Sequence, residues 1–141
     1  MASLHWAYPR SVRFLSKCTF CAHLRLEDLN VTTLLIVNLL TNAVRYGSGQ
    51  IVVEARAHDG QVTVVVANEG NPIPERALPT LFDPLTRATS PDRSGMAAGM
   101  GLGLYICRCI ASAHQGTISV ESSDGGTRFT VQIPCSPSLS V

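Results

Sequence analysis

Apolar residues recur at three- and four-residue spacing over residues 29–46, which is the period of an amphipathic helix. Asn30 and Thr32 are residue types that cap the start of a helix, and Gly47 and Gly49 supply a stop signal just beyond its end. The pattern therefore predicts one long helix in the first third of the chain.

Four strands are predicted by short runs rich in β-branched residues, and they form two hairpins. The first hairpin joins residues 50–57 to residues 61–67 through Asp59-Gly60, a strong signal for a two-residue turn. The second joins residues 117–122 to residues 127–133 across a turn that contains Asp124 and two glycines.

The remaining segments complete the expected order of elements. Residues 11–15 have the composition of a short strand, residues 68–74 of a loop, residues 75–82 of a short helix, residues 83–99 of a long loop and residues 101–114 of a second long helix. Together they predict an α+β fold, a two-layer α/β sandwich with a mostly antiparallel, mixed sheet and helices on one face.

Composition narrows the class of protein further. The chain has 141 residues, of which 45% are hydrophobic and 15% are charged, enough apolar material for one packed domain. The net charge of +1 argues against a nucleic-acid partner or an anionic membrane. The most apolar stretch, residues 34–40, is too short to span a bilayer, and the first ten residues lack the apolar core of a secretion signal. We expect a cytoplasmic domain at residues 26–133, after a segment of uncertain structure (1–25) and before a flexible tail (134–141).

Five cysteines are present, at positions 18, 21, 107, 109 and 135. An odd number does not describe a closed disulfide framework, so we expect reduced thiols. Cys18 and Cys21 have the spacing of a metal or redox pair, but no second pair matches them. Cys107 and Cys109 lie two residues apart in a predicted helix and are expected to point to different faces.

Two asparagines lie one turn apart on the first helix, beside its apolar face. They are Asn38 and Asn42, followed by Arg45 and Tyr46. A buried amide costs roughly 1–3 kcal/mol unless it is hydrogen-bonded. The pair therefore indicates either a polar pocket whose amide oxygens suit Mg²⁺ or two amides that bridge core elements.

Two further segments contain residues that suit a ligand. Residues 99–104 (GMGLGL) open the second helix, where glycines let the backbone approach a phosphate and free N–H groups attract anions. Residues 68–74 (NEGNPIP) end a strand, and Asn68 has the donor and acceptor that match the edge of a purine. Taken separately, a flexible hinge and an ordinary turn explain them equally well.

Taken together and in this order, the segments resemble the ATP-binding catalytic domain of bacterial sensor histidine kinases. That family shares an ATPase superfamily with gyrase, the heat-shock chaperone and the mismatch-repair proteins. The resemblance covers about residues 26–133. The matching motifs are the N box at 38–46 (NLLTNAVRY), the first glycine box at 68–74, the F box at 81–84 (LFDP) and the second glycine box at 99–104, followed by closing strands at 114–116 and 125–131.

The resemblance implies ATP and Mg²⁺ as ligands and gives a role to each matched position. Asn42 would coordinate Mg²⁺ with help from Asn38, Arg45 would reach a phosphate, and Tyr46 would pack beside the adenine. Asn68 takes the place of an aspartate that reads the adenine amine.

The glycine and F boxes supply the other implied contacts. Gly70 would pass under the base, Phe82 would anchor a mobile ATP lid at residues 83–98, and Gly99, Gly101 and Gly103 would cradle the phosphates. Other nucleotide-binding candidates within these motifs are Ile73, Leu102 and Leu104. Arg87 and Arg93, in the lid, are candidates for contact with the γ-phosphate.

Two departures from the family pattern matter, and one further position bears on the mechanism. Asn68 keeps an acceptor but loses the aspartate charge, and a charge-assisted bond is about twice as strong as a neutral one. Pro72 replaces the second glycine of the first box and excludes a positive φ there. Asn38 stands where relatives that hydrolyse ATP have a glutamate, and an amide cannot act as the base that activates water. Phosphoryl transfer to a protein side chain is therefore favoured over hydrolysis.

The acceptor histidine of such a kinase is expected on a separate dimerisation region. None of the four histidines here, at positions 5, 23, 58 and 114, has an acidic neighbour within a long amphipathic helix. We therefore expect either a fragment of a longer kinase, cytoplasmic or the cytoplasmic part of a membrane-anchored sensor, or an acceptor on a partner chain. The response regulator would be an indirect partner.

Two other functions are compatible with the same fold. A serine kinase that antagonises a sigma factor would be compact and close to this length. A nucleotide-dependent interaction module would bind ATP without turnover. The F box and the second glycine box favour the histidine kinase.

Overall fold

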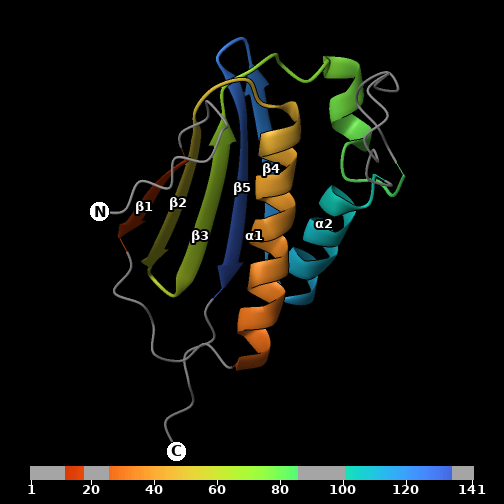
Figure 1. Cartoon of the computed structure of the whole chain (residues 1–141). Helices are drawn as coiled ribbons and strands as arrows, with labels where there is room; N and C mark the ends of the chain where they lie inside the picture. Colours follow the sequence, from red (N-terminus) through yellow and green to blue (C-terminus); the bar gives the residue numbers. More distant parts are fainter. Residues whose placement is uncertain (1–11, 18–25, 86–100, 135–141) are drawn as a thin grey trace, which may run out of the picture.

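The computed structural model describes residues 12–17, 26–85 and 101–134 (Figure 1). Two α-helices, one 3-10 helix and five strands are formed in this part of the chain. In order they are β1 (Val12–Lys17), α1 (Leu26–Tyr46), β2 (Ile51–His58), β3 (Gln61–Asn68), the 3-10 helix η1 (Glu75–Thr80), α2 (Gly103–Ala113), β4 (Thr117–Ser123) and β5 (Gly126–Pro134). The predicted order of helices and strands is confirmed.

The strands form one mixed sheet in the order β1-β2-β3-β5-β4. β1 runs parallel to β2, and the other three pairings are antiparallel. Both α-helices lie on the same face of this sheet (Figure 1). The predicted two-layer α+β sandwich is confirmed. The turn between β2 and β3 has φ +49° at Asp59 and +71° at Gly60, as the predicted two-residue hairpin requires.

The core lies between the helices and the inner face of the sheet. Val53, Val66 and Phe129 are paired across β2, β3 and β5 and point towards the helices. Fully burying a side chain of this size contributes about 1.5–3 kcal/mol. The largest fully buried side chains are Phe129, Leu35, Leu39, Ile51, Val66, Val131 and Cys107.

Most element boundaries differ from those predicted by one to three residues, and the differences at the starts of α1 and α2 have a physical reason. α1 begins at Leu26, so Asn30 and Thr32 lie inside the helix and the prediction that either caps it was wrong. The run Leu26-Glu27-Asp28 contains no glycine or proline that would stop a helix from extending upstream. The second long helix begins at Gly103, two residues later than predicted, because Gly101 has φ +71° and cannot belong to it.

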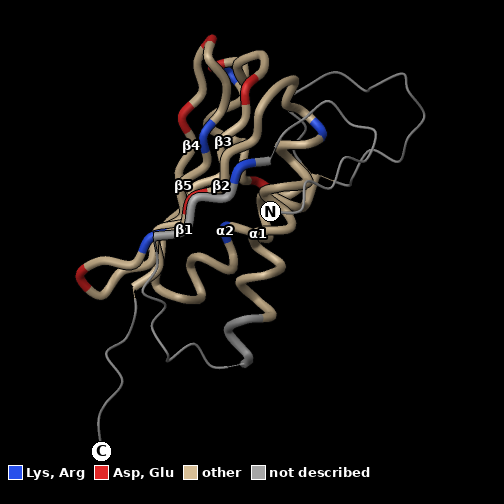
Figure 2. The backbone as a smooth tube through the Cα atoms, turned by 60° about the vertical axis from the view of Figure 1, so that its left-hand side comes forward, with Lys and Arg blue, Asp and Glu red and all other residues tan. Residues whose placement is uncertain are grey.

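Both signs of charge are distributed over strands, turns and the ends of helices, without a large region of one sign (Figure 2). After its first turn, α1 carries a single charged residue, Arg45. None of the described helices is long and apolar enough to cross a membrane.

Several sequence predictions concern residues outside the described ranges. These are Gly99, the arginines at 87 and 93, most of the expected lid (86–98), the cysteines at 18, 21 and 135, and the expected tail from residue 135 onward. The described pair behaves as predicted, because Cys107 is buried and Cys109 is exposed.

Candidate functional site

The N box and the second glycine box meet at the start of α2. The Nδ2 atom of Asn38 donates a hydrogen bond to the carbonyl oxygen of Leu34 at 2.9 Å. Its Oδ1 atom then faces Gly103, at 3.1 Å from the position that a Cβ atom on Gly103 would occupy. A Cβ atom at position 103 would require this oxygen to shift by a few tenths of an ångström, so glycine lets a polar oxygen lie close to the first turn of α2.

Asn42 and Arg45 continue the same face of α1. They follow Asn38 at four- and three-residue spacing, which places the three side chains along one stripe of the helix. Asn42 is half-buried and Arg45 is exposed. Tyr46 ends the helix and is 50% exposed.

The start of α2 provides backbone donors beside this stripe. The preceding residue, Leu102, forms no side-chain capping hydrogen bond. Ile106 N–H donates to the carbonyl oxygen of Leu102 at 2.8 Å, while the N–H groups of Gly103 and Leu104 precede the first donor that a regular helix satisfies. N–H groups in this position attract anions.

The first glycine box crosses the end of α1 at close range. Gly70 has φ +148°, which side-chain-bearing residues rarely adopt. A Cβ atom there would also meet the backbone of Tyr46, Gly47 and Ser48 at 3.2–3.3 Å. Only glycine fits the position without strain, so the chain after β3 runs directly against the last turn of α1.

Asn68 is the last residue of β3 and is 8% exposed. Its Nδ2 atom donates to the carbonyl oxygen of Glu69 at 3.1 Å. This bond orients the amide, so that Oδ1 is the atom with which Asn68 can accept a hydrogen bond. The side chain also packs beside Gly47, where a Cβ atom would lie 3.0 Å from Nδ2.

Two hydroxyl groups beside Asn68 were not among the predicted site residues. Thr127 pairs with Asn68 across β3 and β5 and is 7% exposed. Its hydroxyl lies 2.8 Å from that of Ser122, and Ser122 in turn accepts from the N–H of Ile73 at 2.8 Å. The register of the β4–β5 hairpin could have pointed to them, because it places positions 122 and 127 in the same row as residue 68.

Phe82 anchors the segment after η1 to the core. Its ring meets Phe129 edge to face, with centroids 6.2 Å apart and an interplanar angle of 81°. The next residue, Asp83, forms an ion pair with Arg108 of α2 at 3.2 Å. The F box is therefore held both by β5 and by the helix that starts at the second glycine box.

α1 and α2 are also joined by a buried thiol. Sγ of Cys107 donates to the carbonyl oxygen of Leu35 at 3.6 Å, and burial raises the pKa of Cys107 to about 12. On the exposed side of α2, a hydrogen bond with Cys109 raises the pKa of Tyr105. Cys107 therefore stays protonated at neutral pH and acts as an internal hydrogen-bond donor.

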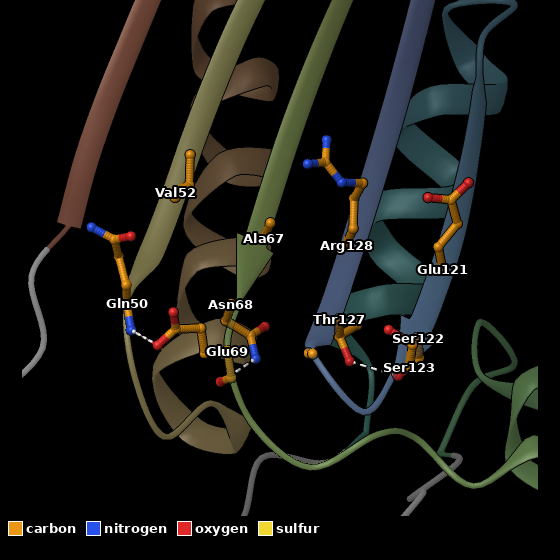
Figure 3. Close-up of a pocket in the computed structure, with 12 residues that line it drawn as sticks. Gln50, Val52, Ala67, Asn68, Glu69, Glu121, Ser122, Ser123, Thr127 and Arg128 are labelled. Atoms are coloured by element: carbon orange, nitrogen blue, oxygen red, sulfur yellow. Dashed lines mark hydrogen bonds between the residues drawn. The ribbon is translucent and has the colours of Figure 1, made fainter.

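A shallow hollow of about 340 Å³ lies at the same end of the sheet but opens on the other face. Figure 3 shows the side chains of Val52, Ala67, Arg128 and Glu121 in front of the strands, with the helices behind. Asn68 and Glu69 of the first glycine box line this hollow together with Ser122 and Thr127, whereas the N box and the second glycine box contribute no residue to it. The N box and the second glycine box lie on the helix side, and we place the candidate site there, with Asn68 at its edge.

A family model described as "Histidine kinase-, DNA gyrase B-, and HSP90-like ATPase" matches residues 27–137. The chain belongs to this family. The resemblance predicted from the four boxes is confirmed.

Similar proteins include a sensor histidine kinase and a sensor protein. The sensor histidine kinase CusS of Escherichia coli K12 is 44% identical over 99 residues, which are 69% of this chain and 20% of CusS. The sensor protein CutS of Streptomyces coelicolor is 41% identical over 93 residues, which are 64% of this chain and 22% of CutS. This member of the family spans about a fifth of the length of the curated relatives it matches.

Solved structures share the fold. The catalytic domain of the histidine kinase ThkA has a TM-score of 0.71 at 28% identity, covering 92% of this chain and 82% of that one. Full-length ShkA in complex with AMPPNP has a TM-score of 0.73 at 23% identity, covering 89% of this chain and 25% of that one.

Proposed function

We propose that this chain is the ATP-binding catalytic domain of a sensor histidine kinase. It binds ATP with Mg²⁺ and donates the γ-phosphoryl group to a histidine on a separate dimerisation region in two-component signalling. The contact between Asn38 and Gly103 carries the proposal, because it places an amide oxygen of the N box directly beside the backbone of the second glycine box.

The polar stripe on α1 is proposed to hold the metal and phosphate end of the nucleotide. Asn42 and Asn38 offer amide oxygens, which are ligand atoms that suit Mg²⁺ when it also binds phosphate. Arg45 follows on the same face and supplies positive charge. When bound, Mg²⁺ would neutralise charge on the β- and γ-phosphates.

The start of α2 is proposed to receive the phosphates themselves. Gly101 and Gly103 leave the backbone open, and the N–H groups at the first turn favour an anion. Asn38 lies so close to Gly103 that a side chain at position 103 would occupy the space proposed for a phosphate. Gly99, Leu102 and Leu104 are the other candidates of the second glycine box.

The end of β3 is proposed to bind the adenine. Oδ1 of Asn68 would accept from the exocyclic amine, since its Nδ2 is already bonded to Glu69. Gly70 and Ile73 would lie against the base, and the Tyr46 side chain would cover it. Thr127 and Ser122 extend this polar edge from β5 and β4.

The proposed reaction depends on positioning rather than on a base within this domain. Asn38 cannot activate water, so the residues of the site hold the γ-phosphate in line for an incoming side chain. Neither described histidine suits the acceptor role. His58 is the last residue of a strand and His114 follows the last residue of α2, so neither lies within a long helix beside an acidic residue. Nδ1 of His114 also bonds to the carbonyl oxygen of Ile110.

The proposal is tested by mixing the purified chain with the dimerisation region of the same kinase, ATP and Mg²⁺. The expected product is phosphohistidine, which is stable to base and labile to acid. Phosphoserine, which is stable to acid, would instead identify the chain as a serine kinase. Tight ATP binding without a labelled acceptor would identify a binding module. A well-folded pair that yields no phosphohistidine contradicts the proposal.

A further inference from the structure

Successive residues of α2 tie the helix to two different neighbours. Cys107 donates to the carbonyl oxygen of Leu35 on α1. Nη1 of Arg108 lies 3.2 Å from Oδ1 of Asp83, in the segment after η1. Because consecutive helical side chains point about 100° apart, these contacts restrain the rotation of α2 about its axis from two directions.

Asp83, the first residue of the segment expected to form the lid, is held through its backbone as well as through its side chain. Its N–H donates to the carbonyl oxygen of Thr80 at 3.0 Å. It directly follows Leu81, which is 7% exposed, and Phe82, whose ring packs against Phe129. The backbone of Asp83 is therefore anchored to the core, and its carboxylate binds Arg108 from that anchored position.

Arg108 also contacts a second residue of α2. Its guanidinium carbon lies 5.6 Å from the centre of the Tyr105 ring, within cation–π range. Tyr105 is the third residue of α2, so the guanidinium spans the first turn of the helix and the F box. The ion pair thus reaches close to the end of α2 that starts at the glycine box.

We propose that Asp83 and Arg108 form a positioning pair for the phosphate-binding end of α2. The pair sets the rotation of the helix and, through it, the position of Gly103 against Asn38. Neither residue is among the nucleotide contacts proposed above. The link to phosphoryl transfer rests on the function proposed above, whereas the effect on the position of α2 does not.

Because the ion pair is exposed, we expect it to affect the position of α2 more than the stability of the fold. The side chains of Arg108 and Asp83 are 43% and 46% exposed. Ion pairs this open contribute little to folding free energy. Transfer rates, in contrast, respond to small displacements of a bound group, so a weak contact in this place has a measurable effect on catalysis.

A double-mutant cycle on the whole chain tests the pair. The variants are D83N, R108Q and D83N/R108Q, with E54Q and R56Q as matched controls. The control residues form an ion pair at 3.1 Å within β2, away from the helices. The first measurement is the amide chemical shifts of Gly101, Gly103 and Leu104 in the protein without nucleotide. The second measurement is the rate of phosphotransfer to the dimerisation region at saturating ATP. Melting curves report whether a variant has lost stability.

Each single variant is expected to move these amide shifts and to lower the transfer rate about two- to fivefold, the range that an exposed pair supports. The double variant should match either single variant, and melting points should change no more than in the controls. Unchanged amide shifts in D83N and R108Q, or additive effects in the double variant, would contradict the proposed positioning role of the two residues. A failure of the unsubstituted chain to transfer phosphate refutes only the proposed kinase function, because the amide shifts still decide the inference.

Discussion

The side-chain oxygen of Asn38 lies 3.1 Å from the position that a Cβ atom on Gly103 would occupy. The two residues are 65 positions apart and belong to different helices. Their contact joins the face that offers amide oxygens to the helix end that offers N–H groups. A single methyl group at position 103 would therefore disturb both halves of the proposed phosphate site.

Substitution of Gly103 by alanine is expected to separate nucleotide binding from stability. Alanine favours helix by up to about 1 kcal/mol over glycine, so the melting temperature should be kept or raised. The new methyl group presses on Asn38, and we expect ATP affinity in calorimetry to fall about tenfold, equivalent to about 1.4 kcal/mol. Gly125→Ala is the control, because a Cβ atom there meets only the Ser123 hydroxyl, at 3.9 Å. Equal ATP affinities in G103A and the unsubstituted chain would show that the contact is irrelevant to binding.

Asn42→Ala tests the proposed Mg²⁺ ligand on the polar stripe of α1. In the unsubstituted chain, ATP affinity should rise when Mg²⁺ is added, because the metal is proposed to bridge phosphate and amide oxygens. In N42A this dependence on Mg²⁺ should be lost while the fold is kept. Thr41→Ala is the neighbouring control, since the Thr41 hydroxyl bonds only to the carbonyl oxygen of Val37 and is exposed. An N42A variant that responds to Mg²⁺ as the unsubstituted chain does would remove Asn42 from the metal site.

Much of the fold was predictable because each element has a strong local signal. The hairpin turn at Asp59-Gly60 needs positive φ at both residues, and few other residue pairs supply it so readily. Contacts between elements were less accessible. Nothing in the local pattern shows that Ser122 bonds to Ile73, because this depends on how β4 and β5 pair and how the loop after β3 folds back. The start of α1 was also missed, since capping residue types inside a helix are tolerated when the upstream residues continue it.

Asn68→Asp is expected to destabilise the domain rather than to restore a stronger nucleotide contact. The Nδ2 atom of Asn68 donates to the carbonyl oxygen of Glu69, and a carboxylate in its place would face that oxygen without a proton. Since position 68 is 8% exposed, the cost is about 1–3 kcal/mol.

The pH dependence of N68D follows from the same contact. Burial raises the pKa of a carboxyl group above its unfolded value near 3.9. The loss of stability should therefore be small at low pH, where the acid can donate to Glu69, and should grow as pH rises. Melting curves from pH 4 to pH 8 measure this, with the exposed Asn71→Asp as control. Higher stability or tighter ATP binding in N68D at pH 8 would contradict the orientation of the amide.

Cys107 should make stability depend on pH in the alkaline range. Burial raises its pKa in the folded state to about 12, above the usual thiol value of 9.0. The stabilising effect of the neutral thiol is complete below pH 9 and is lost as pH rises towards 12, at up to about 1.4 kcal/mol per pH unit. Subtracting the urea-unfolding free energies of Cys107→Val from those of the unsubstituted chain isolates this term from other titrating groups. Identical pH dependence in both proteins would show that the thiol is not buried in the neutral form.

Cys109 and Cys107 should differ sharply in their reaction with iodoacetamide. The thiolate is the reacting species, and Cys107 is both fully buried and protonated at pH 8, whereas Cys109 is exposed. Trypsin cuts after Arg108, so the two cysteines fall in separate peptides and mass spectrometry can count each modification. We expect rapid labelling of Cys109 in the native protein and labelling of Cys107 only in denaturant. Comparable native rates at the two positions would mean that α2 does not pack against α1 as described, and the contact between Asn38 and Gly103 would then be in question too.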